Sequence, residues 1–244
     1  MLLSVRRIMP LVGALLTTST ATSAVAVTGT ILLSGTIVGC ADDREPQTHV
    51  DRLKDPAKRV NAIKRLIQFY EDAMTRDKKD RAGPSVKPLL DTIVGPLAAE
   101  AAKGDLAGKT QGKLLSMLAD TGDARATPAL VKSLAAYKPD DRAGEQFDAD
   151  MSNVVRALGK SKPKEAAAPM LELFVNLRAS WPKAQYKQFY RILRDTMLEV
   201  ADPSWEAKLI TLLDRPIKTL NKKQMKKITD EIYWQTVAAE VLGL

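Results

Sequence analysis

Apolar residues recur at helical spacing through most of the chain after its first fifty residues. Val60, Ile63, Leu66, Ile67 and Tyr70 fall on one face of a helix with about 3.6 residues per turn. No segment shows the strict alternation of a half-buried strand. We therefore predict an all-α fold with nine helices, at residues 56–76, 85–103, 109–120, 124–137, 147–159, 163–179, 183–200, 204–214 and 222–242.

Eight of these helices are expected to form hairpins, and the ninth is left over. Asp55-Pro56 and Asp202-Pro203 mark two helix starts, because aspartate is a good N-cap and the first helical turn does not need the N–H that proline lacks. The last helix carries an apolar stripe, but no partner helix follows it. Three interpretations stay open: it caps the array, it pairs with another chain, or further repeats follow.

The helical pattern repeats with a period near forty residues. One marker is an apolar residue at the end of the first helix of a hairpin, with spacings of 40, 42 and 42, at Leu118, Leu158, Val200 and Leu242. A second marker begins with proline in the second helix, with spacings of 40 and 41, at Pro88-Leu89-Leu90, Pro128-Ala129-Leu130 and Pro169-Met170-Leu171. Two markers that share one period indicate an internal repeat.

The repeating unit resembles a HEAT repeat. Besides the period and the Asp-Pro turns, Arg59-Val60-Asn61-Ala62 matches the Arg-x-x-Ala stripe of that family, with Ala62 where a small residue lets two helices approach. The resemblance covers residues 53–244. It implies an α-solenoid of about four and a half repeats that acts as a non-catalytic protein–protein scaffold. Some HEAT-repeat proteins resemble lyases that attach bilins, which leaves an enzymatic alternative for which no residue can be named.

The first forty residues have a different composition. Arg6 and Arg7 precede 32 uncharged residues that end in small side chains, as in export signals. The sequence Ile37-Val38-Gly39-Cys40 resembles the bacterial lipobox. The resemblance implies that residues 1–39 are a signal peptide that is removed and that Cys40 is lipidated. The alternatives are an uncleaved membrane-spanning helix and ordinary secretion after residue 26.

Residues 40–52 are then expected to be the lipidated cysteine and a polar tether. If extended, residues 41–51 would span about 36–40 Å. Ala41, rather than aspartate, follows Cys40, and by the sorting habit of enterobacterial lipoproteins this favours the outer membrane, facing the periplasm. An uncleaved helix would instead anchor the protein in the inner membrane. The expected partner is another envelope protein, and the lipid on Cys40 supplies the contact with the membrane.

Composition and charge exclude several classes of chemistry. Two of the 37 basic residues precede Cys40, so the remaining 35 basic and 29 acidic residues give residues 41–244 a diffuse net charge of +6, which does not favour nucleic-acid binding. His49 is the only histidine, which excludes a histidine triad and a zinc site with two histidines. The sequence contains no glycine-rich phosphate loop. We expect no catalytic residue, metal, cofactor or small-molecule substrate.

Two features are candidate binding determinants. Lys222, Lys223, Lys226 and Lys227 crowd the start of the last helix, where positive charge opposes the helix dipole. They are candidates for binding anionic lipid or an envelope polymer, and the alternative is an ordinary solvated face. Trp234 is a candidate because tryptophan is enriched at protein interfaces, and the alternative is packing between repeats.

Overall fold

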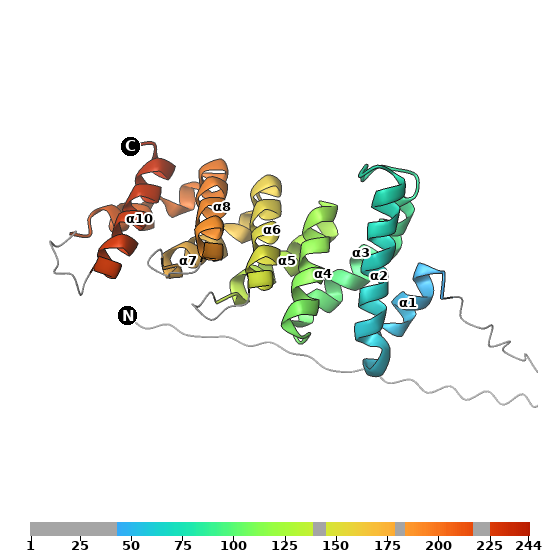
Figure 1. Cartoon of the computed structure of the whole chain (residues 1–244). Coiled ribbons are helices and arrows are strands. Elements are labelled where there is room, and N and C mark those ends of the chain that lie inside the picture. Colours follow the sequence, from blue (N-terminus) through green and yellow to red (C-terminus); the bar gives the residue numbers. More distant parts are fainter. Residues whose placement is uncertain (1–42, 139–144, 179–183, 217–224) are drawn as a thin grey trace, which may run out of the picture. The chain divides into compact units, whose positions relative to one another are not determined.

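The computed structural model describes residues 43–138, 145–178, 184–216 and 225–244 (Figure 1). Within these ranges the chain contains no strand, which confirms the all-α character that the sequence predicts. Ten α-helices and two short 3₁₀ turns follow one another: α1 (Pro46–Arg52), α2 (Pro56–Arg76), α3 (Val86–Lys103), α4 (Gly108–Thr121), η1 (Ala124–Ala126), α5 (Thr127–Ala136), α6 (Glu145–Ser161), α7 (Lys164–Asn176), α8 (Ala184–Val200), η2 (Pro203–Trp205), α9 (Glu206–Leu213) and α10 (Met225–Leu242).

Aspartate side chains start several of these elements. The Asp55 carboxylate accepts a hydrogen bond from the Ala57 N–H at 2.9 Å, and α2 begins at the intervening proline. Asp202 accepts from the Ser204 N–H at 2.9 Å and starts η2 in the same way. The two Asp-Pro start signals are therefore confirmed. Asp123 does the same for η1, without a proline, by accepting from the Arg125 N–H at 2.9 Å.

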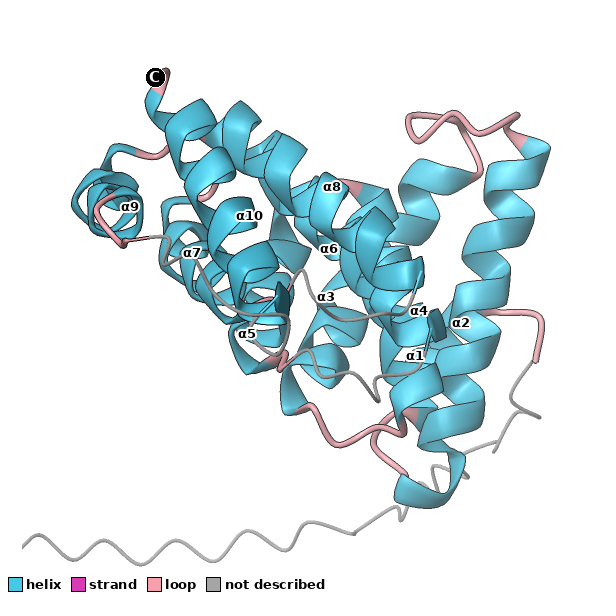
Figure 2. Ribbon diagram, turned by 60° about the vertical axis from the view of Figure 1, so that its left-hand side comes forward, coloured by secondary structure: helices cyan, strands magenta, loops and turns pink. Residues whose placement is uncertain are grey.

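The helices pack largely in sequence order. α4 packs against α6 and α6 against α8, while α3 packs against α5 and α5 against α7. Figure 2 shows these neighbours from a second direction. At the two ends, α1 packs against α2 and α3, and α10 packs against α9 and α8. Each hairpin therefore meets the hairpins that precede and follow it, and the residues at these junctions decide how tightly they join.

The apolar face predicted for α2 is mostly buried. Ile63, Leu66, Ile67 and Tyr70 are 8% exposed or less. Val60 was expected on the same face, but it is 38% exposed. The difference arises because Val60 lies near the start of α2, and a helix end is less completely covered by its neighbours than the middle.

The first helices of three successive hairpins end on the same backbone conformation, which fixes the register of the repeat. Gly122, Lys162 and Ala201 follow α4, α6 and α8 with φ of 65°, 46° and 41°, the left-handed region that favours glycine. The N–H groups of Lys162 and Ala201 donate to the carbonyls of Leu158 and Met197, each at 2.8 Å.

This register corrects one marker from the sequence. Counting back four residues from each left-handed residue gives Leu118, Leu158 and Met197, all 1% exposed or less. Met197 is therefore the equivalent of Leu118, and Val200 is not. The sequence comparison matched apolar residues, whereas the helix ends set the true repeat, with spacings of 40 and then 39 residues between the left-handed positions.

Part of the predicted tether is folded. Residues 46–52 form α1, which packs on α2 and α3. His49, which falls in the predicted tether, is 6% exposed; its Nε2 lies 3.0 Å from the Asp43 carbonyl and its ring lies 5.7 Å from the Phe69 ring. The assignment of residues 46–52 to a tether is therefore wrong. Proline at the first helical position and contacts with α2 stabilise a short helix that the polar sequence did not predict.

Candidate functional site

Most residues of the predicted anchor and lysine cluster lie outside the described part of the chain. These are Ile37, Val38, Gly39, Cys40, Lys222 and Lys223. Lys226 and Lys227 lie in the first turn of α10, where only the backbone is described. No helix in the described ranges has the length and apolar character needed to span a bilayer. Those same ranges contain no cluster of metal-ligating side chains.

Trp234 belongs to the core and does not form an exposed contact surface. Its side chain is 3% exposed, and its indole N–H donates to the Phe174 carbonyl at 3.1 Å. The Arg178 guanidinium lies 4.9 Å from the ring centre. Trp234 therefore links α10 to α7, and we correct its candidate role in partner binding, because a direct contact requires an exposed side chain.

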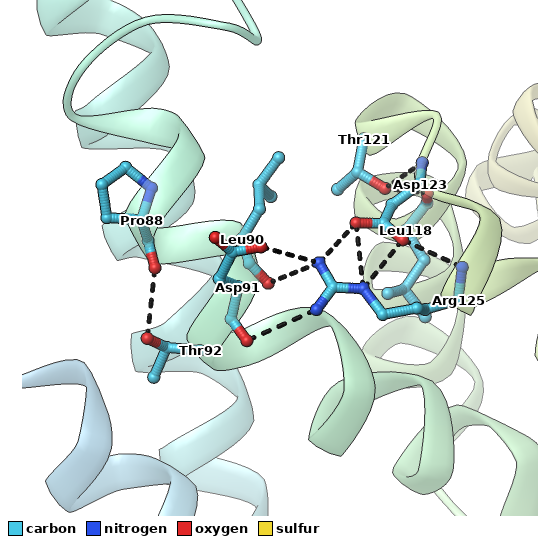
Figure 3. A network of polar contacts seen from close by, with 8 residues as sticks. All are labelled: Pro88, Leu90, Asp91, Thr92, Leu118, Thr121, Asp123 and Arg125. Atoms are coloured by element: carbon cyan, nitrogen blue, oxygen red, sulfur yellow. Dashed lines mark hydrogen bonds and ion pairs between the residues drawn. The ribbon is translucent and has the colours of Figure 1, made fainter.

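Three successive junctions between hairpins can be compared at equivalent positions. We call them junction A (α2–α3 with α4–α5), junction B (α4–α5 with α6–α7) and junction C (α6–α7 with α8–α9). At junction A, Arg125 bridges the hairpins (Figure 3). It donates to both carboxylate oxygens of Asp123, and Nη2 and Nη1 reach the carbonyls of Leu90 and Asp91 at 3.3 and 3.4 Å. The Arg125 guanidinium also lowers the pKa of the Asp123 carboxyl.

Junction C is closed by three contacts. The Trp205 side chain is 1% exposed, and its indole N–H donates to the Ala167 carbonyl at 2.9 Å. Gly159 lies so near Thr196 that a Cβ added at the glycine would overlap the Thr196 Cγ2. The Lys162 ammonium donates to the Glu199 carbonyl at 2.5 Å. These contacts join α6 and α7 to α8 and η2.

Junction B contains an open groove of about 700 Å³. Its walls come from the end of α4, η1, α5, the end of α6 and the start of α7. Most of the lining is apolar or small, and the lining residues are Leu118, Ala119, Gly122, Asp123, Ala124, Thr127, Pro128, Leu130, Val131, Lys132, Ala157, Ser161, Pro163 and Glu165. The volume lies in the range of small-molecule and side-chain binding pockets.

Small residues at junction B replace each of the three contacts that close junction C. In the register set by the left-handed residues, Ala166 corresponds to Trp205, and Gly122 corresponds to Lys162. Ala119 and Ala157 correspond to the Gly159–Thr196 contact, and both line the groove. Ala166 is itself 3% exposed and does not line the groove, so the groove opens beside Gly122 and Ala157, which are smaller than Lys162 and Thr196.

The groove offers few charges to an occupant. Arg125 already binds Asp123, and Nη2 lies 2.6 Å from the Asp123 Oδ2. Lys132 and Glu165 are exposed, and neither forms an ion pair with another described residue. The arrangement can bind an apolar group and can add one positive and one negative contact at its edge.

Two other hollows are more polar. One, of about 800 Å³, lies between α1, α2 and α3 and includes Arg44, Asp72 and Arg76 in its lining. Another, of about 300 Å³, lies between α6 and α8 and includes Arg156, Arg191 and Glu199. Because charged side chains line both, the groove of junction B is the better candidate for binding an apolar group.

The sequence did not predict this groove. A signal is present in the alanines at positions 119 and 157, which line it, but the apolar match at Val200 hides the register in which they correspond to Gly159 and Thr196. Comparison with known proteins adds no further evidence, because no protein-family model, no curated protein and no solved structure matches the chain.

Proposed function

We propose that this protein is a lipid-anchored scaffold of the bacterial envelope, which binds a partner protein in the groove of junction B. The scaffold part is a HEAT-like helical array, and Cys40 carries the lipid. The array is supported by the period near forty residues and by the largely sequential packing of the hairpins. The anchor is supported by the lipobox-like sequence that ends at Cys40.

The open groove between two closed junctions is the observation that carries the proposal. A junction that serves only to join two hairpins gains stability when apolar side chains fill it, since a void forfeits packing contacts. Junction C has such filling, and junction A is bridged by Arg125. An accessible, largely apolar hollow at junction B is therefore better explained by an external occupant.

Site-directed photo-crosslinking tests the scaffold role. A photo-reactive amino acid at position 132, in the groove lining, should form a crosslink to an envelope protein in intact cells. The same amino acid at position 135, an exposed site on the same helix that does not line the groove, is the control. Sequencing the crosslinked peptide identifies the contacting segment.

The scaffold proposal requires the crosslink to depend on the groove. Ala157→Trp, which places a large side chain in the lining of the groove, should abolish the crosslink from position 132. Ala135→Trp should leave it intact. A crosslink that survives Ala157→Trp, or equal crosslinking from both positions, would contradict binding in the groove.

Mass spectrometry of the mature protein tests the anchor. We expect the N-terminus to be an acylated Cys40, and we expect Cys40→Ser to abolish both acylation and processing. Two acyl chains would hold the protein stably on a membrane, because each buried methylene contributes about 0.8 kcal/mol. A mature protein that begins at Met1 or near residue 27 would overturn the anchor and leave the groove to be tested separately.

A second candidate function is binding of anionic lipid or an envelope polymer through the lysine cluster. The observation that favours it is the position of Lys226 and Lys227 in the first turn of α10, where cations oppose the helix dipole. Retention on anionic vesicles that falls with salt and is lost in Lys222→Glu/Lys226→Glu would support it. Retention that the double variant leaves unchanged would exclude it.

A further inference from the structure

We infer that the hollow between α1, α2 and α3 binds the phosphate headgroup of an anionic phospholipid. The volume of this hollow is about 800 Å³. The inference rests on the proposed lipid anchor and adds a second, non-covalent contact with the same membrane. Three observations carry it: cations in and beside the hollow, an apolar wall, and the position of the anchor in the chain.

The cations come from three segments of the chain. Arg44, just before α1, and Arg76, in the last turn of α2, both line the hollow. Lys78 and Lys79 are exposed and follow Arg76 in the loop that joins α2 to α3. Ser85, at the end of this loop, lines the hollow again. The loop therefore begins and ends at the edge of the hollow, and its two lysines extend the positive surface.

The loop is fixed with both lysines at its surface. Lys78 and Lys79 adopt φ of 51° and 67°, and the Lys79 N–H donates to the Met74 carbonyl at 2.7 Å. Further along the loop, Arg81 pairs with Asp120 on α4 at 2.6 Å. Glycine suits left-handed positions better than any residue with a Cβ, so two lysines here lower stability. Binding an anion gives these charges a use.

Nearby carboxylates do not pair with these lysines. Asp77 accepts a hydrogen bond from the Ser85 N–H at 2.7 Å, and Asp80 accepts one from the Ala82 N–H at 2.9 Å. Neither aspartate forms an ion pair with a lysine of the loop in the part of the chain that the structure describes. The lining itself contains two arginines and one carboxylate, Asp72, which leaves a net charge of +1. Together with the lysines, this surface favours an anion.

The hollow also has an apolar wall, which includes Phe69, Pro88 and Leu89. Its volume exceeds what a bare phosphate ion needs and lies in the range of pockets for larger ligands. A phospholipid joins a charged phosphate to a glycerol that carries apolar chains. Guanidinium groups such as those of Arg44 and Arg76 bind phosphate with paired hydrogen bonds, and the apolar wall can receive the glycerol and the first methylenes. The lining therefore matches a headgroup better than a soluble inorganic anion.

The position of the anchor selects a membrane lipid as the source of the phosphate. Cys40, the proposed acylation site, lies four residues before Arg44. Four extended residues reach roughly 13–14 Å, so an acylated Cys40 holds the bilayer surface near the hollow. Basic groups close to a membrane attract anionic headgroups. No other described arginine or lysine lies nearer to Cys40 along the chain than Arg44.

Paramagnetic relaxation of amide signals in nanodiscs tests the inference. The acylated full chain is placed in discs of phosphatidylcholine alone and in discs that also contain phosphatidylglycerol. Each disc carries a trace of lipid with gadolinium on its headgroup. Amides of the α2–α3 loop should relax faster in the anionic discs, relative to amides of α7, and the difference should shrink in high salt. Equal relaxation in both discs would overturn the inference and leave the anchor standing.

Variants show whether the contact depends on the cations of the hollow. Arg76→Glu/Lys79→Glu should reduce the relaxation to the level of neutral discs. Lys113→Glu/Lys208→Glu makes the same change of charge at exposed lysines of α4 and α9 and should preserve the relaxation. Lys78→Gly/Lys79→Gly removes two charges and suits the left-handed turn, so it should lose the lipid contact without losing stability. Relaxation that survives Arg76→Glu/Lys79→Glu, or that falls equally in the control pair, would overturn the inference.

Two further outcomes assign a failure to the correct proposal. Loop signals that shift with inorganic phosphate in neutral discs, but do not respond to phosphatidylglycerol, would overturn the assignment to a lipid. If mass spectrometry finds no acylated Cys40, the anchor falls, and the same relaxation measurement on the chain mixed with both kinds of disc decides the inference. Faster relaxation in anionic discs that Arg76→Glu/Lys79→Glu removes would support it, and equal relaxation would overturn it.

Discussion

Junctions B and C have the same backbone plan and opposite degrees of filling. In both, a helix ends on a left-handed residue and the chain enters the second helix through a short turn. Junction C places an indole, a glycine–threonine contact and a lysine bond between its hairpins. Junction B places alanines and a glycine at the equivalent positions and leaves a groove of about 700 Å³. The difference thus lies in a few side chains.

The comparison shows how a repeated fold can make one junction specialised. Filling a junction stabilises the pair of hairpins, because buried apolar side chains contribute roughly 1.5–3 kcal/mol each. An open junction gives up that contribution and gains a surface that another molecule can occupy. The remaining junctions must then supply the stability, and variants at junctions A and C should be the more damaging ones.

The largest expected effect is that of Trp205→Ala at junction C. Removing a fully buried tryptophan should lower the free energy of unfolding by about 3–5 kcal/mol, because the indole contacts and the bond to Ala167 are both lost. Urea denaturation measures this loss. Ala157→Trp at junction B should change stability much less, since Ala157 lines the groove and the groove has room for the ring. A loss below about 1 kcal/mol for Trp205→Ala would show that junction C is not closed by its indole.

Gly159→Ala at junction C should have the next largest effect. The added methyl group would overlap the Thr196 side chain, and overpacking of this kind costs about 1–3 kcal/mol. Thr196→Ser removes the overlapping methyl group, so the double variant should recover most of the loss. At junction B, Ala119→Gly should cost only about 0.5–1 kcal/mol, the helix propensity of the residue. Thermal or urea unfolding distinguishes the three variants.

Arg125→Ala at junction A should have a smaller effect. The side chain is 44% exposed, so solvent screens its ion pairs with Asp123 and Asp91, and we expect a loss of about 1 kcal/mol or less. The loss should shrink in high salt, because screening weakens the pairs in the parent protein. A loss as large as that of Trp205→Ala would mean that junction A depends on the Arg125 bridge as strongly as junction C depends on its indole.

The smallest expected effect is on how stability depends on acid pH, through the two aspartates that cap these turns, Asp123 and Asp202. The Arg125 guanidinium lowers the pKa of Asp123, and hydrogen bonds from Ser204 lower that of Asp202. A carboxyl group with a lowered pKa in the folded state stabilises the fold above its unfolded pKa of about 3.9. That contribution should be lost as the pH falls below about 4 and passes through the lowered folded value. Asp123→Asn and Asp202→Asn should each make the urea midpoint depend less steeply on pH between pH 5 and pH 2. A midpoint that varies with pH as steeply as in the parent protein would contradict this prediction.

Local signals predicted most of the fold. The helix from Pro56 to Arg76 has the predicted bounds, because an Asp-Pro start and a 3.6-residue apolar period are both encoded within the segment itself. The short helix α1 was missed for the opposite reason. Its seven residues carry little periodic signal, and it is stabilised by contacts such as that of His49 with Phe69, which lies twenty positions later in the chain.

The candidate site depended on information that the sequence pattern did not contain. A groove lined by alanines is visible only when the residue opposite each alanine is known, and that requires both the packing order and the repeat register. The apolar match at Val200 shifted the register by three residues relative to Met197. The sequence left Trp234 open between an interface and packing between repeats for a similar reason, since its hydrogen-bond acceptor, Phe174, lies sixty positions earlier.

The early start of α1 sets how freely an anchored protein could move. With Cys40 lipidated as proposed, six backbone steps separate the lipid from Pro46, and at roughly 3.3–3.6 Å per step they reach only about 20 Å. A tether this short would limit the tumbling of the helical array and favour a restricted range of its orientations at the bilayer. The partner would then meet the groove in a nearly two-dimensional search at a roughly fixed height. Lengthening the segment before α1 would change the capture rate of the partner and leave its affinity for the groove unchanged.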